Sequence, residues 1–280
     1  MKEVAYVNGV FCDLAEARVS IEDRGFQFAD GVYEVVVAPG GRPFRLAHHL
    51  ERLRRSTEGI GLEIDYARLD LPGIIARGIE LAGFPDTMIY VQLTRGAMSR
   101  DHLYPQGLVP TVVATFKAKP PQDPERRRVG LSLETVRDFR WEKCYIKATA
   151  LLANVMVKNA ARSRGCFDGL MVSSEGWVRE TSAANIFIVS GGRLKTPPAG
   201  ERILHGVTRG YILECGREIG LPCDESEFTV PELMAAEEAF LSSTTLDIMP
   251  VTRVDGRLIG TGTPGPVSAR LLEQFYIGMR

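Results

Sequence analysis

The chain has 280 residues, of which 45% are hydrophobic and 25% charged, as is ordinary for a globular protein with an apolar core. Its formal net charge is −1 and its lysines and arginines are scattered, which excludes the basic stripe typical of nucleic-acid binding. Its five cysteines form no Cys-x-x-Cys pair, so we expect neither a disulfide framework nor a metal site. The sequence shows neither the apolar segment of a signal peptide nor a stretch of about 18 apolar residues that would span a membrane. We therefore expect a cytoplasmic enzyme or binding protein.

The first part of the chain predicts hairpins and helices. Asn8-Gly9 separates apolar runs at 4–7 and 10–11, and this dipeptide is typical of a tight hairpin turn. The spacing of His49, Arg52, Leu53 and Ser56 indicates a helix. A second helix is predicted over 65–83, and strands over 31–37, 87–94 and 111–118.

A proline cluster then divides the chain. Three prolines lie between residues 120 and 124, where neither a helix nor a strand continues. We therefore predict a smaller N-terminal α/β domain over 1–119, a linker over 120–125 and a larger C-terminal, cofactor-binding domain over 126–280.

In the C-terminal domain, strands are expected at 129–134, 168–172, 185–189 and 238–242, and helices at 148–164, 207–219, 231–236 and 266–277. This mixture predicts an α+β or mixed α/β fold, and no Gly-x-Gly-x-x-Gly follows a strand to indicate a dinucleotide fold.

Lys147 is the candidate for covalent chemistry. A lysine is a useful nucleophile as a neutral amine, which an enclosed environment favours. Lys147 lies between the apolar Tyr145-Ile146 pair and a small-residue segment, whereas Lys143 follows a glutamate and is expected at the surface. From this local context alone, a surface lysine at a helix end is the commoner interpretation.

Several motifs in order resemble the fold-type IV pyridoxal-phosphate enzymes, also called class-IV aminotransferases. Ile146-Lys147, with the residues that follow it up to Ala160, resembles the segment of the cofactor lysine. Further similar segments lie at 16–26, 30–35, 49–53, 179–182 with 185–187, and 203–209. The resemblance therefore covers nearly the whole chain and implies a two-domain fold with pyridoxal 5′-phosphate bound to Lys147.

The resemblance also assigns the other cofactor contacts. Glu180 is implied as the carboxylate that keeps the pyridine nitrogen protonated, because a nearby anion favours that charge. Arg52 matches the family's phosphate arginine, although in a run with Arg54 and Arg55 it is otherwise a solvated side chain. Val207 and Thr208 open an expected helix whose amides suit a phosphate. Thr244 is a further candidate for the phosphate, and Leu204 matches the residue that packs on the cofactor ring.

A loop between two expected strands carries the substrate signal. Arg100 and His102 are two residues apart, so in an extended chain their side chains lie on the same side. A guanidinium with a second donor beside it suits an α-carboxylate. The pair resembles the carboxylate trap of D-amino-acid aminotransferases, which acts in the partner subunit, and Tyr33 matches the tyrosine of the same pocket. A homodimer is implied by this resemblance alone.

Two positions depart from the family pattern. Asp101 lies between the two donors, where better-known members carry an uncharged residue. Its carboxylate either pairs with Arg100 and weakens the trap or points away. Ala183-Ala184 replaces hydroxyl residues that are common near the cofactor.

The implied reaction is a ping-pong transfer of the amino group from a D-amino acid, such as D-alanine, to 2-oxoglutarate or another 2-oxo acid. Three alternatives share the fold: a branched-chain L-aminotransferase, an aminodeoxychorismate lyase and an (R)-amine aminotransferase. A fourth alternative is a binding or structural protein of this fold, without a cofactor.

Overall fold

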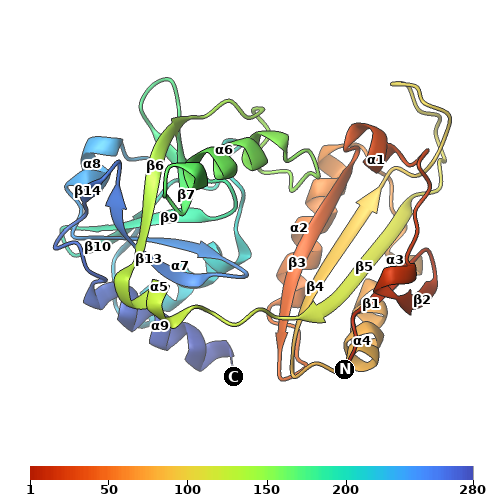
Figure 1. Ribbon diagram of the computed structural model, residues 1–280, viewed down its shortest axis with the longest axis horizontal. Coiled ribbons are helices and arrows are strands. Elements are labelled where there is room, and N and C mark those ends of the chain that lie inside the picture. Colours follow the sequence, from red (N-terminus) through yellow and green to blue (C-terminus); the bar gives the residue numbers. More distant parts are fainter. Residues whose placement is uncertain (280) are drawn as a thin grey trace. The chain divides into compact units, whose positions relative to one another are not determined.

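The computed structural model describes residues 1–279, which form two compact units (Figure 1). The first unit contains Met1–Pro121 together with Ile146–Ala150, and the second contains Gln122–Tyr145 with the chain from Leu151 onward. The predicted mixture of helices and sheets in two parts is confirmed. The break after Pro121 lies inside the expected linker over 120–125. The short segment that carries Lys147 belongs to the first unit, whereas the sequence places it within 126–280.

An antiparallel sheet forms the first unit. Five strands of the described chain build it in the order β2-β1-β5-β4-β3. The predicted hairpin is confirmed, since Val7 pairs with Val10 and the turn residues Asn8 and Gly9 have positive φ angles of 45° and 101°. The strands are β1 (Val4–Val7), β2 (Val10–Asp13), β3 (Gly31–Pro39), β4 (Asp86–Thr94) and β5 (Thr111–Ala118).

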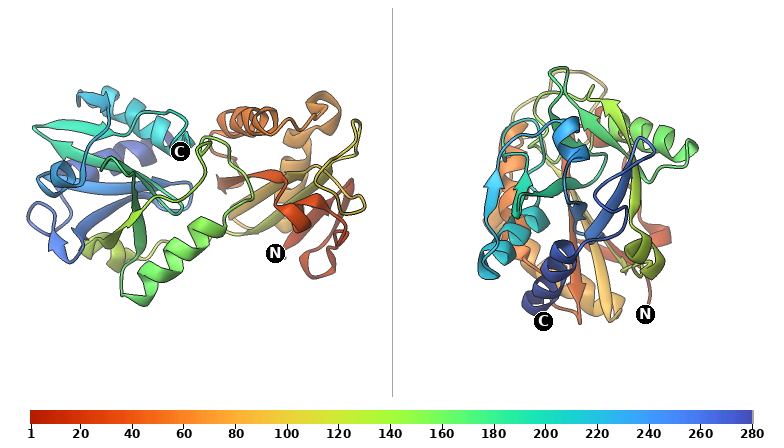
Figure 2. Two further views of the ribbon diagram at one scale, coloured as in Figure 1. Left: turned by 90° about the horizontal axis from the view of Figure 1, so that it is seen from above. Right: turned by 90° about the vertical axis from the view of Figure 1, so that its left-hand side faces the viewer.

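Helices α2 (Leu46–Gly59) and α4 (Leu71–Ala82) cover one face of this sheet (Figure 2). The single helix predicted over 65–83 is wrong, because Asp70 adopts a positive φ of 45° and separates α3 (Tyr66–Leu69) from α4. Asp70 then caps α4 by accepting a hydrogen bond from the Gly73 amide. The 3-10 helix η1 (Leu14–Glu16) and the short helix α1 (Arg24–Phe28) precede β3.

A buried cluster of charged groups fixes α2 to β3. Glu34 accepts hydrogen bonds from Nε and Nη2 of Arg52, at 2.7 and 2.8 Å, and from Nδ1 of His49 at 2.8 Å. Burial raises the pKa of the Glu34 carboxyl, but the charge of Arg52 and the hydrogen bonds outweigh it and lower the pKa to about 2. Burial also lowers the pKa of His49. At neutral pH the cluster therefore joins an anion to a cation with little solvent around them.

The second unit contains a larger, mixed sheet. Within the described residues its strands follow the order β11-β10-β9-β12-β13-β6-β7-β8, and β14 pairs with β13. Because β8 also pairs with β9, six of these strands close into a ring around an apolar core that includes Leu133, Leu170, Ile186 and Leu241. The strands are β6 (Leu131–Arg137), β7 (Asp168–Val172), β8 (Val178–Thr181), β9 (Asn185–Ser190), β10 (Arg193–Thr196), β11 (Cys223–Glu225), β12 (Glu238–Ser243), β13 (Asp247–Val254) and β14 (Arg257–Leu258).

The helices of the second unit are α5 (Pro124–Val129), α6 (Leu152–Ser163), α7 (Val207–Glu218), α8 (Val230–Met234) and α9 (Pro266–Met279). The expectation of a strand from 129 is wrong at its start, because Asp123 caps α5 and Pro124 occupies its first turn. The sequence analysis did not predict β13, which contains Pro250, a residue that disfavours a strand. No helix of residues 1–279 is long and apolar enough to cross a membrane.

Glu34→Gln is predicted to destabilise the protein by about 3–5 kcal/mol at pH 7, because it removes a buried counter-ion of Arg52. The pKa of Glu34 is depressed, so its contribution to stability is present above about pH 4.5 and is lost as the pH falls towards about 2. Urea unfolding of the wild type and of Glu34→Gln at pH values from 7 to 3 measures this difference in the free energy of unfolding.

The matched control is Glu51→Gln, at an exposed ion pair on α2, the helix that carries Arg52; there the free energy of unfolding is expected to stay at the wild-type value. An equal effect of the two substitutions would contradict the assignment of the buried cluster.

Candidate active site

The segment around Lys147 pairs with the edge of the first sheet. The Tyr33 amide donates to the Lys147 carbonyl at 3.0 Å, and the Thr149 amide donates to the Gly31 carbonyl at 2.9 Å. Ala148 forms an antiparallel bridge with Val32 between these two bonds. This pairing explains why α6 begins at Leu152 and not at Ala148 as predicted, since residues 147–149 are extended along β3.

Lys147 is half-buried and held from two sides. Its amide donates to Oγ of Ser56 on α2 at 3.1 Å, and its Nζ lies 4.2 Å from the centre of the Tyr33 ring. The Tyr33 ring stacks on Tyr90 at 5.5 Å, and burial raises the pKa of Tyr90 to about 12, so Tyr90 is a neutral partner. The structure therefore brings together two of the predicted site residues, Lys147 and Tyr33.

Arg52 lies on the same helix as Ser56, one turn earlier, and is buried. Its bidentate pair with Glu34 fixes the direction of the guanidinium. Glu34 faces α2, whereas its neighbour Tyr33 lies on the other face of β3, as alternation along a strand requires. The assignment of Arg52 to the cofactor phosphate stays a prediction.

Glu180 occupies the second unit, on β8, where it pairs across a hairpin with Asn185 of β9. Its buried carboxylate accepts from Nη1 of Arg140 at 2.6 Å, from Nδ2 of Asn185 at 3.0 Å and from the Leu204 amide at 3.1 Å. Burial raises the pKa of Glu180, and the Arg140 charge and these donors oppose that effect. The carboxylate is therefore buried and held in one direction by its three donors.

Arg140 is itself held by a second carboxylate. Its Nη2 donates to Asp138 at 2.9 Å, and the side chain is largely buried. Burial opposes the charge of Arg140, but Glu180 and Asp138 raise its pKa above the ordinary value. The guanidinium is therefore a permanent cation behind Glu180.

Helix α7 begins beside this carboxylate, with Gly206 as its N-cap, and among the described residues it has no side-chain hydrogen bond as a cap. A Cβ at Gly206 would lie 2.1 Å from Oδ1 of Asn185, so only glycine allows this close approach. Val207 and Leu204 are half-buried and Thr208 is buried. A helix start with open amides and a nearby threonine suits a phosphate group.

Two hydroxyl residues lie at the end of β12. Ser242 pairs with Asn185 across the sheet, and its buried hydroxyl has no hydrogen-bond partner among the described residues. Thr244 is half-buried in the turn between β12 and β13. A buried hydroxyl without a partner fits a site that a polar group completes.

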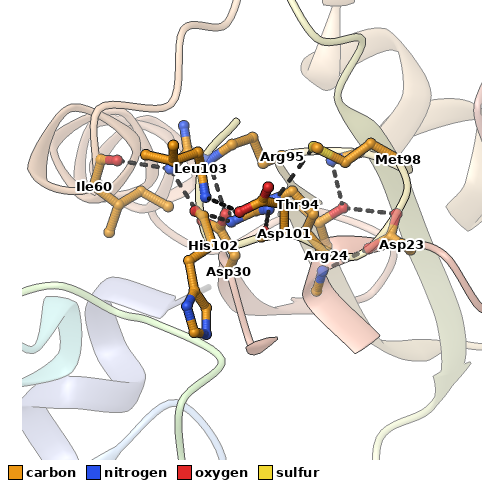
Figure 3. Close-up of polar contacts among 12 residues, drawn as sticks. Asp23, Arg24, Asp30, Ile60, Thr94, Arg95, Met98, Asp101, His102 and Leu103 are labelled. Carbon is orange, nitrogen blue, oxygen red and sulfur yellow. Dashed lines mark hydrogen bonds and ion pairs between the residues drawn. The ribbon is translucent and has the colours of Figure 1, made fainter. Parts of the chain in front are cut away.

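Arg100 and His102 lie in the exposed loop between β4 and β5, in the first unit. The Arg100 guanidinium is 4.8 Å from the centre of the Phe28 ring, and the His102 ring centre is 5.4 Å from it. The Asp101 carboxylate accepts from the Leu103 amide at 3.0 Å (Figure 3). Within residues 1–279 no ion pair joins Asp101 to Arg100. The Asp101 carboxylate is therefore bound to the loop backbone and not to the Arg100 guanidinium. Neither Arg100 nor His102 is hydrogen-bonded or ion-paired to Lys147 within the described chain.

The sequence analysis missed several partners of the predicted residues. Ser56 was noticed for its helix spacing alone, and Asn185 only as part of a motif. Arg140 gave no signal, because an arginine seven residues before Lys147 reaches Glu180 only through the fold. These residues hold the predicted ones in place.

Comparisons with known proteins agree on one family. The family model described as amino-transferase class IV matches residues 31–254. A D-alanine aminotransferase of Bacillus licheniformis is 37% identical over 262 residues, which is 93% of this chain and 92% of that protein. A D-alanine aminotransferase of Staphylococcus haemolyticus is 34% identical over 277 residues, or 98% of both chains.

Solved structures of branched-chain aminotransferases share the fold. That of Thermoproteus uzoniensis, with norvaline, has a TM-score of 0.88 at 29% identity and covers 99% of this chain and 94% of that one. Another, from T.th., with pyridoxamine 5′-phosphate, has a TM-score of 0.90 at 25% identity, covering 99% and 93%. The predicted fold-type IV architecture is confirmed. The chain belongs to the class IV aminotransferases.

Proposed function

We propose that this protein is a D-amino-acid aminotransferase that uses pyridoxal 5′-phosphate and moves the amino group of D-alanine to 2-oxoglutarate or a similar 2-oxo acid. The observation that carries the proposal is the pairing of Arg100 with His102 on Phe28, in a chain 34–37% identical to D-alanine aminotransferases. The reaction takes place in two half-reactions, so that donor and acceptor use the same site in turn.

Lys147 is the proposed catalytic residue. When bound, pyridoxal phosphate supplies an aldehyde that amines attack and a ring that withdraws electrons from the substrate Cα. The Lys147 Nζ atom holds the cofactor between turnovers and then takes and returns the proton at Cα. Support comes from its backbone bonds to Tyr33 and Ser56, which fix the chain at Lys147.

The second unit supplies the proposed contacts to the ring, and it shares those to the phosphate with Arg52 of the first unit. Glu180, held as an anion by Arg140, favours the protonated form of the ring nitrogen. Leu204, whose amide binds Glu180, packs on the ring. The phosphate contacts are assigned to the first amides of α7, at Val207 and Thr208, and to Arg52 and Thr244. The open start of α7 and the unpartnered Ser242 hydroxyl beside it support this assignment.

The substrate carboxylate is proposed to bind Arg100 and His102, with Tyr33 on the same pocket wall. An arginine offers paired donors that match a carboxylate, and a histidine adds a third. Their exposure leaves both side chains open to a ligand, and Asp101 is engaged with Leu103.

A homodimer is part of the proposal, with Arg100 and His102 acting in the partner's site. Large apolar side chains near the trap are 74–79% exposed, namely Ile21, Phe26, Leu103 and Val109. Helix α6 also exposes apolar residues at helical spacing, namely Leu152, Val155 and Met156. Such surfaces are typical of subunit interfaces. All five cysteines are free thiols, which supports the proposed cytoplasmic location.

A branched-chain L-aminotransferase is the second candidate, because the solved branched-chain enzymes share the fold over 99% of this chain. That similarity concerns the fold, whereas the higher sequence identities are to D-alanine aminotransferases. Comparing the first half-reaction with a D-amino acid and with an L-amino acid distinguishes the two candidate functions.

Lys147→Ala is predicted to abolish transamination, and Arg100→Ala to lower kcat/KM for D-alanine by about 10- to 100-fold while bound cofactor is retained. Stopped-flow absorbance of the holoenzymes with D-alanine and L-leucine measures both effects. Lys143→Ala, at an exposed lysine of the same segment, is the control and should match wild type. Fast reaction with L-leucine and none with D-alanine would refute the proposed substrate class.

Mixing the inactive Lys147→Ala variant with the weakened Arg100→Ala variant tests the shared site. A hybrid dimer of Lys147→Ala with Arg100→Ala has one site with an intact Lys147 and an intact Arg100 of the partner subunit. After subunit exchange, about a quarter of wild-type activity should return, since half of the dimers are hybrids with one complete site each. No recovery, with hybrids verified by native mass spectrometry, would mean that the trap does not act across subunits.

A further inference from the structure

The loop that carries Arg100 and His102 has little regular structure of its own. Residues 96–110 connect β4 to β5, and most of them are exposed. Two donors that bind one carboxylate must keep a fixed separation, or the ordering of the loop subtracts from the binding free energy. The trap therefore needs a rigid attachment beneath it.

Arg24 provides this attachment. Its Nη1 donates to the Asp101 carbonyl at 2.5 Å and its Nη2 to the His102 carbonyl at 3.2 Å, while its Nε donates to Asp30 at 2.8 Å (Figure 3). The side chain is buried. In Figure 3 the His102 imidazole points away from these contacts. One planar guanidinium thus binds two consecutive carbonyls and leaves the imidazole available.

Asp30 anchors Arg24 to the body of the unit through a second arginine. Nε and Nη2 of Arg95 donate to Asp30 at 2.8 and 3.0 Å, and Arg95 also donates to the carbonyls of Ile60 and Gly61. Burial raises the pKa of Asp30, but hydrogen bonds and charges of the two arginines outweigh it and lower the pKa. Asp30 is therefore a permanent anion that orients both guanidinium groups.

Helix α1 places Arg24 and Phe28 together under the loop. Asp23 caps this helix by accepting from the Gly25 amide, and it also accepts from the Thr94 hydroxyl on β4. The Arg24 guanidinium lies 4.9 Å from the Phe28 ring, which Arg100 and His102 also contact. The backbone and the side chains of the trap thus rest on the same short helix.

We propose that Arg24 is a positioning residue for the substrate carboxylate, which it serves by fixing the backbone between Arg100 and His102. This inference rests on the proposed function of Arg100 and His102. Arg24 does not touch the substrate. Its three nitrogens bind in three directions, which a lysine ammonium on one flexible stem does not reproduce.

The test compares Arg24→Lys, Arg100→Ala and the double variant as holoenzymes. Arg24→Lys should raise KM for D-alanine and Ki for propionate about tenfold, with kcat, cofactor absorbance and dimer mass near the wild-type values. In the Arg100→Ala background, Arg24→Lys should have little further effect, because both act on one carboxylate contact. Arg18→Lys is the control and should behave as wild type, since within residues 1–279 the Arg18 guanidinium donates to the carbonyls of its own neighbours, Ala15 and Ala17.

Each outcome decides the matter. If Arg100→Ala raises KM and Ki but Arg24→Lys does not, the positioning role is overturned while the trap stands. If Arg24→Lys raises KM and Ki as much in the Arg100→Ala background as in the wild type, the positioning role is also overturned, because the effect is then independent of Arg100 and reflects a general structural defect. A neutral Arg100→Ala would overturn the trap itself. If Arg24→Lys fails to fold, Arg24→Gln replaces it in the same cycle, with the same expected rise in KM and Ki.

Discussion

The pairing of residues 147–149 with the edge strand β3 is the interaction on which the rest of the site depends. An edge strand has unpaired amides and carbonyls, and here the backbone of the Lys147 segment satisfies two of them. This places a lysine that is distant in sequence in the first unit, beside Tyr33. The Ser56 hydroxyl adds a bond from α2, so that strand, segment and helix fix the lysine backbone together.

Both units use a buried carboxylate held by an arginine to give rigidity where the chain has a functional residue. In the first unit, the pair of Glu34 and Arg52 fixes α2 to β3. In the second unit, Arg140 fixes the direction of the Glu180 carboxylate. Such pairs contribute little net stability, because desolvation offsets the attraction, but removing one partner is costly. Their value here is geometric: each charged group has one direction in which its hydrogen bonds are satisfied.

The sequence predicted the elements whose signals are local. Asn8-Gly9 indicated its hairpin, and the spacing of His49, Arg52 and Ser56 indicated α2. Prediction failed where a tertiary contact overrides the local pattern: the small residues from Ala148 on favour a helix, but pairing with β3 keeps them extended. Of the site, the sequence indicated Lys147 and Glu180 through motifs. It did not indicate Arg140 or Arg24, because their partners are 40 and 77 residues away in the chain and meet them only after folding.

Lys147, fixed on the edge of the first sheet, is the residue that we propose carries the cofactor. Borohydride reduction of the holoenzyme, followed by protease digestion and mass spectrometry, locates the lysine that was bound to the cofactor. We expect a phosphopyridoxyl group on Lys147 and on no other lysine. A label on Lys143 or Lys158, or none on a protein that contains bound cofactor, would contradict it.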